Sequence, residues 1–330
     1  MHWLARILPS KPQEPSEHQR RRDLGRRISK LILPLVFLAW LSFLTISSPV
    51  FLTWRNLSNV SRQVAVVGLL SLGQLTVMLT GNIDLSSASL MGLFGAVLAG
   101  QSKDIAFPVA LVMALVLALV WGLSNGFLVT RGKNISVIVT LSTMYIAQGL
   151  LLIYTQGQPV IMFPMPYEFL GIGSFGPIPW SLIAFSLVAL IIALVLRFAP
   201  VGRHVYAVGG NREAARVCGI DVKRLIVGVY VTSAMIASLA SLILLSRVAS
   251  AQPNAGVGME LDSIAAVLIG GASVSGGYGT VLGTMIGVFI LGFINNGLNL
   301  LGVSGYYQYV LKGAIILIAV LVETLQRRGE

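Results

Sequence analysis

The stretch "SIAAVLIGGASVSGGYGTVLGTMIGVFILGFINNGLNLLGVSGYYQYVL", from Ser263 to Leu311, contains no charged residue over 49 positions. A single helix of this length would extend about 74 Å at about 1.5 Å per residue, whereas the hydrocarbon core of a bilayer is about 30 Å thick. The stretch must therefore fold back on itself. The whole chain is 55% hydrophobic and only 11% charged, with a mean hydropathy of +0.84, whereas about a quarter of the residues in a soluble domain are charged. The sequence therefore predicts an all-α polytopic membrane protein.

Apolar segments along the rest of the chain predict about ten transmembrane helices. The segments are 31–52, 60–80, 84–101, 105–130, 135–155, 180–198, 225–246, 260–275, 281–301 and 306–323. If the N-terminus is cytoplasmic, alternate crossings place 18 of the 23 Lys and Arg residues on the cytoplasmic side, as the positive-inside rule favours. The chain then divides into a basic cytoplasmic tail, a transmembrane domain with one long cytoplasmic loop, and a short cytoplasmic C-terminal tail. These parts are 1–30, 31–323 with the loop 199–224, and 324–330.

The net charge of +11 is concentrated near the N-terminus, where eight of the 23 basic residues precede Leu31. A basic tail next to a membrane helix is attracted to anionic lipid headgroups. This distribution favours contact with the bilayer and argues against a nucleic-acid partner. The single cysteine, Cys218, excludes an internal disulfide framework and a cysteine-based metal cluster.

Two of the apolar segments contain an acidic residue and glycine breaks. "LTGNIDLSSASLMG" contains Asp84, and "LDSIAAVLIGGASVSGG" contains Asp262. Irregular backbone at membrane depth requires cover from protein or a water-filled cavity, and broken helices in matching halves indicate a transport pathway. An inverted repeat of segments 2–5 and 7–10 would place the two acids at opposite membrane surfaces. Alternatively, both carboxylates simply cap helix N-termini, which is compatible with the repeat.

Enzyme motifs are not supported by the rest of the sequence. "GVSG" at 302–305 matches the G-x-S-G of intramembrane serine proteases, but such a serine needs a base to remove its proton. The only histidines, His2, His18 and His204, fall outside the predicted helices. The chain contains neither H-E-x-x-H nor the phosphate loop G-x-x-x-x-G-K-[ST]. We therefore expect a protein that binds no metal or cofactor itself and does not hydrolyse ATP by itself.

The polar stretch "GNREAARVCGIDVKR", 210–224, predicts a short surface helix between two apolar segments and contains the pattern E-A-A-x-x-x-G. This pattern resembles the loop by which permease subunits of bacterial ABC importers dock onto their ATPase. "GNIDLSSASL" is similar to the G-G-I-D-L-S-V-G-S stretch of the sugar permeases in that superfamily. The stretch 250–323 resembles the C-terminal third of ribose-type permease subunits, and the likeness covers about 55–323.

The resemblance implies a docking role for six residues of this loop: Arg212, Glu213, Ala214, Ala215, Arg216 and Gly219. It also implies a partner ATPase that carries ATP and magnesium, a periplasmic sugar-binding protein, a homodimer, and ribose or a similar monosaccharide as substrate. The protein would lie in the bacterial inner membrane with both termini in the cytoplasm. The basic side chains of the loop would pair with acidic groups of the ATPase. Alternatively, the stretch is an ordinary basic cytoplasmic loop.

The sequence departs from the family pattern at three places. Asn82 stands where the family commonly has Gly, Ser87-Ala88 replaces Val-Gly, and Tyr278 stands where a basic residue is frequent. These departures lie beside the glycine breaks, so the architecture is better supported than the identity of the sugar. An ion-coupled secondary sugar carrier is the alternative function, because such carriers keep ionisable groups within the membrane.

Sugar hydroxyls are usually met by amide and carboxylate side chains, which predicts a polar translocation pathway. The candidates are Asp84, Asn125, Asp262, Asn295, Asn299 and Gln308, with Gln74 and Gln148 also within membrane segments. Asn295 and Asn299 are four residues apart and share a helix face, whereas Asn296 points about 100° away. Amides in membrane helices also join helices to one another by hydrogen bonds, so that interpretation stays open.

Overall fold

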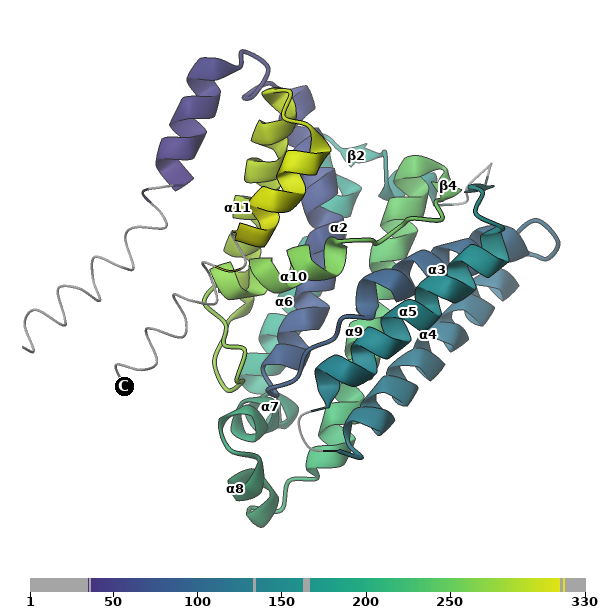
Figure 1. Ribbon diagram of the computed structural model, residues 1–330, viewed down its shortest axis with the longest axis vertical. Helices are drawn as coiled ribbons and strands as arrows, with labels where there is room; N and C mark the ends of the chain where they lie inside the picture. The colour runs from purple at the N-terminus through teal and green to yellow at the C-terminus, as the bar shows by residue number, and fades with distance from the viewer. Residues whose placement is uncertain (1–34, 36, 133–134, 163–166, 315–316, 318–330) are drawn as a thin grey trace, which may run out of the picture. The chain divides into compact units, whose positions relative to one another are not determined.

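The computed structural model (Figure 1) describes residues 35, 37–132, 135–162, 167–314 and 317. The predicted tails 1–30 and 324–330 lie outside these residues. The described chain divides into two units, one up to Pro49 and one from Val50 onward. The first unit contains the apolar helix Phe37–Ser47.

The second unit is built from helices, and each of the predicted apolar segments within it contains one. They are α2 (Trp54–Met78), α3 (Ser87–Gln101), α4 (Phe107–Val129), α5 (Ser136–Thr155), α6 (Trp180–Phe198), α7 (Pro200–Gly210), α8 (Arg212–Val217), α9 (Val222–Val248), α10 (Met259–Ile269) and α11 (Val281–Leu300). Residues 305–314 form a further helix, and η2 (Glu168–Leu170) is a 3-10 turn. The all-α prediction is confirmed for the described residues, apart from two small strand pairs. In these pairs β1 (Val160–Ile161) joins β4 (Ser250–Ala251), and β2 (Ser174–Phe175) joins β3 (Ile178–Pro179).

Six helices of the described residues are long and apolar enough to cross a membrane: α2, α4, α5, α6, α9 and α11. The two segments that the sequence predicted to be broken form the shorter helices α3 and α10. α3 begins only after the Gly81–Asp84 stretch, and α10 ends before Gly270-Gly271. These six helices agree with a polytopic membrane protein, and the glycine breaks lie where the sequence placed them.

Local capping explains where several helices begin. The Thr53 hydroxyl accepts a hydrogen bond from the Asn56 N–H at the start of α2. The side chains of Asp221 and Thr280 accept equivalent bonds at the starts of α9 and α11. Each cap satisfies one backbone N–H that has no partner within its own helix.

α2 and α9 form the centre of the second unit (Figure 1). In α2 and α9, 78% and 61% of the span residues are buried, against 17–22% in α4, α5 and α6. α2 packs against α6, α9, α10 and α11, and α9 also packs against α3 and α4. Figure 1 shows α7 and α8 at one end of this unit and β2 and β4 at the opposite end. The large apolar side chains exposed on α4, α5 and α6 are those expected of lipid-facing helices.

Glycines bring α4 and α9 into backbone contact. A Cβ added at Gly122 would lie 2.7 Å from Val231 Cα, and one at Gly126 would lie 2.6 Å from Val227 Cα. The two glycines are four residues apart on one face of α4, which is the small-residue spacing of closely packed membrane helices. A larger side chain at either position would force the helices apart.

Gly126→Leu should therefore lower the unfolding free energy, measured in detergent micelles, by about 1–3 kcal/mol through overpacking. Gly149→Leu on α5 is the matched control, because a Cβ there meets nothing within 4 Å. The control should change the free energy by no more than about 0.5 kcal/mol. Equal losses in both variants would show that the α4–α9 contact is not responsible.

Candidate functional site

The break between α2 and α3, residues 79–86, is organised around Asp84. This side chain is only 2% exposed. Its carboxylate accepts hydrogen bonds from the Ser86 N–H at 2.9 Å, from the Ser86 hydroxyl at 2.8 Å and from the Ser233 hydroxyl of α9 at 2.9 Å. Asp84 thus lies two residues before Ser86, which is the N-cap residue of α3, and its carboxylate accepts hydrogen bonds from Ser86 and from a second helix.

Two further helices supply partners to the break. The Asn125 amide of α4 donates to the Ser86 hydroxyl at 2.7 Å, so two of the predicted pathway residues, Asp84 and Asn125, meet through one serine. The carbonyl of Ile83 accepts hydrogen bonds from Tyr230 of α9 at 3.0 Å and from Thr140 of α5 at 3.2 Å. Side chains of α4, α5 and α9 therefore satisfy polar groups that would otherwise lie unpaired at membrane depth.

Arg212, the first residue of α8, also reaches the break. Its guanidinium donates to the Asn82 side-chain oxygen at 2.8 Å and to the Thr80 carbonyl at 3.2 Å. Asn82 is 2% exposed, and it is one of the positions where the sequence departs from the family pattern. The structure thus places Arg212 against the chain's own broken segment, whereas the sequence had suggested an acidic group on a partner.

α8 itself is a capped and exposed helix. The Asn211 side chain accepts from the Ala214 N–H at 2.9 Å, and Gly219, the residue after the C-cap Cys218, has a φ of +85°. The Gly219 N–H bonds to the Arg216 carbonyl and the Ile220 N–H bonds to the Ala215 carbonyl, which is a Schellman arrangement. The E-A-A-x-x-x-G pattern therefore specifies both the helix and its left-handed end.

The six residues predicted to dock a partner divide into two groups. Arg212 and Ala215 face inward, Ala215 being 4% exposed. The other four, Glu213, Ala214, Arg216 and Gly219, are exposed, and Glu213 pairs with Arg216 at 2.9 Å. Val217 is 85% exposed on the same helix. α8 thus presents small and apolar side chains, with one ion pair beside them, at one end of the second unit.

α7 and α8 together, residues 200–219, are called the docking segment below. Gly209 of this segment packs against the Leu79 carbonyl and Gly277 so closely that a Cβ would overlap both. The Gly277 N–H also donates to the Leu79 carbonyl at 2.9 Å. The Tyr206 hydroxyl donates to the Gly279 carbonyl at 2.8 Å, and burial raises the pKa of this phenol. The docking segment therefore touches the loops that follow α2 and α10.

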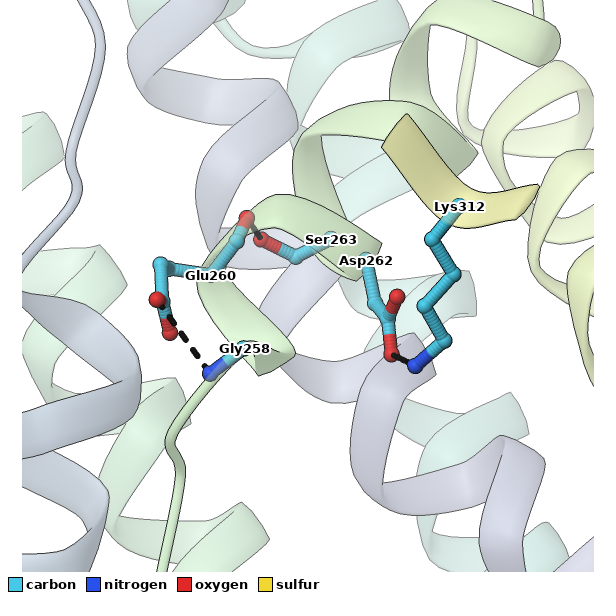
Figure 2. A network of polar contacts seen from close by, with 5 residues as sticks. All are labelled: Gly258, Glu260, Asp262, Ser263 and Lys312. Carbon is cyan, nitrogen blue, oxygen red and sulfur yellow. Dashed lines mark hydrogen bonds and ion pairs between the residues drawn. The ribbon is translucent and has the colours of Figure 1, made fainter. Parts of the chain in front are cut away.

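A separate polar group joins α10 to the helix 305–314. Figure 2 shows Asp262 and Lys312 pointing toward one another, with a distance of 2.8 Å between carboxylate and ammonium. In the same view, Glu260 accepts from the Gly258 N–H, and the Ser263 hydroxyl donates to the Glu260 carbonyl. The ion pair is largely buried, with side-chain exposures of 10% for Asp262 and 27% for Lys312. Asp262 is therefore paired with Lys312 in this structure, and it lies apart from Asp84 and Asn125.

The predicted amides of the C-terminal part form two distinct contacts. Gln308 donates to the Asn299 side chain at 2.8 Å, where Asn299 is exposed, and Asn295 is half-buried. Asn296 instead exchanges two hydrogen bonds with Asn56 of α2, at 2.9 and 2.8 Å. The sequence spacing correctly placed Asn296 on a different helix face from Asn295 and Asn299. Its partner Asn56 lies 240 residues away, so no local pattern in the sequence could indicate the pair.

A cavity of about 250 Å³ lies between α3, α9 and the loop 249–258. Its polar lining comes from Ser241, Ser250, Gln252 and Asn254. None of the six predicted pathway residues lines it. The stretch "SAQPNAG" carries the polar residues of this loop, but nothing in its spacing indicates that they face a cavity.

Comparison with known proteins bears on the assignment. Residues 56–320 match the family described as branched-chain amino acid transport system / permease component. The chain belongs to this permease family. The expected resemblance to a permease subunit is thereby confirmed.

Individual relatives of this permease are named for sugar import. It is 47% identical over 282 residues to the ribose import permease protein RbsC of Bacillus subtilis, covering 84% of this chain and 88% of that protein. The RbsC protein of Escherichia coli K12 is 42% identical, with 89% and 92% covered. The L-arabinose ABC transporter permease protein AraH of Azospirillum brasilense is 32% identical, with 98% and 95% covered. No solved structure matches the chain.

The contact between Arg212 and Asn82 should be energetically coupled. Arg212→Ala should lower the unfolding free energy by about 1.5–3 kcal/mol, because a hydrogen bond to a charged group is lost and Asn82 is left buried without its donor. Asn82→Ala should also destabilise the protein, and the double variant should lose clearly less than the sum. Arg216→Ala, at a side chain that is 72% exposed, should change stability by no more than about 0.5 kcal/mol. Strict additivity of the two single losses would contradict the coupling.

Proposed function

We propose that the chain is the transmembrane subunit of an ATP-driven importer that moves ribose or a similar monosaccharide across the bacterial inner membrane. The observation that carries the proposal is Arg212, which connects an exposed helix with the E-A-A-x-x-x-G pattern to the broken segment at Asn82. The sugar is supported by the names of the relatives at 47% and 42% identity. The family description names another substrate, so the family by itself supports only the permease role.

The proposed topology has about ten crossings with both termini in the cytoplasm, built from an inverted repeat of α2–α5 and α9 to 305–314. Reciprocal packing supports the repeat: α3 packs against α9 while α10 packs against α2, and α4 packs against α9 while α11 packs against α2. Each half also has a loop with a positive-φ glycine between its first and second helices, Gly81 in one half and Gly256 in the other. Two halves related by a pseudo-twofold axis in the membrane plane would produce this exchange of partners.

The proposed assembly is a homodimer that binds two kinds of partner. An ATPase holding ATP and magnesium would dock on α8, and a periplasmic sugar-binding protein would dock at the opposite end. Movement of α8 would reach the break through Arg212 and reach the loop after α10 through Gly209, because both residues contact those loops directly. The docking segment would thereby couple ATP hydrolysis to the two interrupted segments.

Polar groups available to a sugar lie at two levels. The cavity lined by Gln252 and Asn254 measures about 250 Å³, somewhat below the range of about 300–1,000 Å³ for drug-sized ligands, which suits a small monosaccharide. Deeper in the unit, Gln74 is fully buried, and neither its amide nitrogen nor its oxygen has a partner among the described residues. The same holds for the Asn125 side-chain oxygen. We propose that a passing sugar bonds to these amides when the helices separate.

The alternative of an ion-coupled carrier has less support. Such a carrier requires ionisable groups that bind or release the coupling ion within the membrane. Asp84 accepts three hydrogen bonds and Asp262 is paired with Lys312, so both carboxylates already have partners. The hydrogen bonds of Asp84 favour a structural role at the break.

The topology can be measured with the native cysteine. Cys218 is exposed, just after α8. A membrane-impermeant maleimide should leave Cys218 unlabelled in intact spheroplasts and label it after permeabilisation. In a Cys218→Ala background, Asn254→Cys should be labelled without permeabilisation, since Asn254 is exposed in the loop 249–258. Labelling of both positions from one side would mean that a crossing has been miscounted.

Function can be tested in proteoliposomes that contain this chain, its ATPase and the sugar-binding protein. Ribose uptake should require ATP inside the vesicle and should persist when ion gradients are collapsed. Val217→Lys should reduce both ATPase co-purification and sugar-stimulated ATP hydrolysis, because it places a charge on the apolar face of α8 without disturbing buried atoms. Asp104→Lys, an exposed position next to α3, should leave both unchanged. Uptake by this chain alone, driven by a proton or sodium gradient, would overturn the proposal.

A further inference from the structure

An apolar groove of about 600 Å³ runs between α4 and α9 near the start of α9. Leu119, Leu123 and Phe127 form one wall, and Val227 and Val231 lie on the other. The three α4 side chains are 40–51% exposed. The close crossing at Gly122 and Gly126 brings the two helices together here, so the groove lies over a firm backbone contact. It is an open surface groove between α4, which exposes large apolar side chains, and the α9 residues that line it.

One end of the groove carries three cations: Arg131, Lys223 and Arg224. The Arg131 guanidinium lies 4.3 Å from the centroid of the Phe127 ring, which holds the charge over the apolar wall. Arg224 pairs with Asp221, but their exposures of 90% and 53% leave that pair open to solvent screening. Lys223 forms no ion pair with any other described residue. Three cations against the one carboxylate leave a net charge of +2 at this end.

We infer that the groove binds one anionic phospholipid, with the phosphate at Arg131, Lys223 and Arg224 and an acyl chain along the apolar wall. The basic end of the groove matches the phosphate of such a lipid, and the apolar wall matches its acyl chain. Basic pockets between membrane helices are known to bind anionic headgroups. Lys223 and Arg224 lie in the first turn of α9, which is separated from the end of α8 by four residues, so the headgroup would lie near the docking segment. The inference requires only the membrane location of the chain, and it holds whether or not the transported molecule is a sugar.

A second copy of the chain is a less suitable occupant. A twofold interface places the same patch of each subunit against its counterpart. If the groove lay on such an axis, the three cations of one copy would face the three cations of the other. Like charges at that distance repel, whereas a phosphate neutralises them.

The groove can be altered without disturbing the core. A Cβ added at Gly228 meets nothing within 4 Å, so Gly228→Leu should fill the groove while keeping the helix intact. Arg131→Gln and Lys223→Gln remove charge from the headgroup end. Arg197→Gln is the matched control, because Arg197 also lies at a helix end beside an aromatic ring, 5.4 Å from the centroid of Phe198, but does not line the groove.

The experiment is native mass spectrometry of the full-length protein in detergent, titrated with phosphatidylglycerol or with zwitterionic phosphatidylethanolamine. The wild type and Arg197→Gln should bind phosphatidylglycerol in preference to phosphatidylethanolamine. Each charge-removing variant should weaken phosphatidylglycerol binding by about fivefold, and Gly228→Leu should abolish the preference. Oligomer mass, measured in the same spectra, should be unchanged in every variant.

Three outcomes would overturn the inference. The first is equal retention of the two lipids by the wild type, and the second is unchanged phosphatidylglycerol binding in all three groove variants. The third is a change in oligomer mass for Gly228→Leu with lipid binding intact, which would identify the groove as a subunit interface.

Discussion

Backbone that leaves a helix inside a bilayer must find hydrogen-bond partners within the protein, and residues 79–86 depend on this constraint throughout. Asp84 draws donors from α9, Ile83 from α5 and α9, and Asn82 from α8. These partners lie far apart along the chain, so the break can exist only when several helices are already assembled. This irregular part of the membrane domain is for that reason hydrogen-bonded to several helices.

The glycines around this site allow the backbone of neighbouring segments to pack closely against the break. Gly81, Gly209 and Gly276 allow the break, helix α7 and the loop after α10 to approach at distances that a Cβ would prevent. Side chains at these positions would separate the docking segment from the loops that follow α2 and α10. Close backbone contact allows little relative displacement between the docking segment and the loops that it touches. Such a contact suits a segment that transmits movement to the membrane domain.

Much of this architecture could be read from local sequence. Long apolar runs predicted the helices, Gly-rich interruptions predicted the short α3 and α10, and the polar stretch 210–224 predicted a short surface helix, whose left-handed residue Gly219 is a finding of the structure. Hydrogen bonds between residues far apart in the sequence could not be predicted, because the residue type of an amide or a guanidinium does not indicate which group it will bond to. Arg212 was expected to face another protein, yet its acceptors are Asn82 and Thr80. The sequence could not show whether the asparagines line a pathway or join helices by hydrogen bonds. For Asn296 the answer came from the structure, which pairs it with Asn56.

The reciprocal amide pair between Asn56 and Asn296 has a mechanical consequence. Each side chain both donates and accepts, so sliding α2 along α11 by a single residue, about 1.5 Å, would break both bonds at once in a buried setting. Asn56 lies in the first turn of α2, and the opposite end of that helix leads into Gly81. α2 is thus held in register with α11 at its first turn, and its other end leads into the hydrogen-bonded break at Asp84. A longitudinal shift of α2 relative to α11 would therefore leave two buried amides unpaired, at the desolvation cost of both groups.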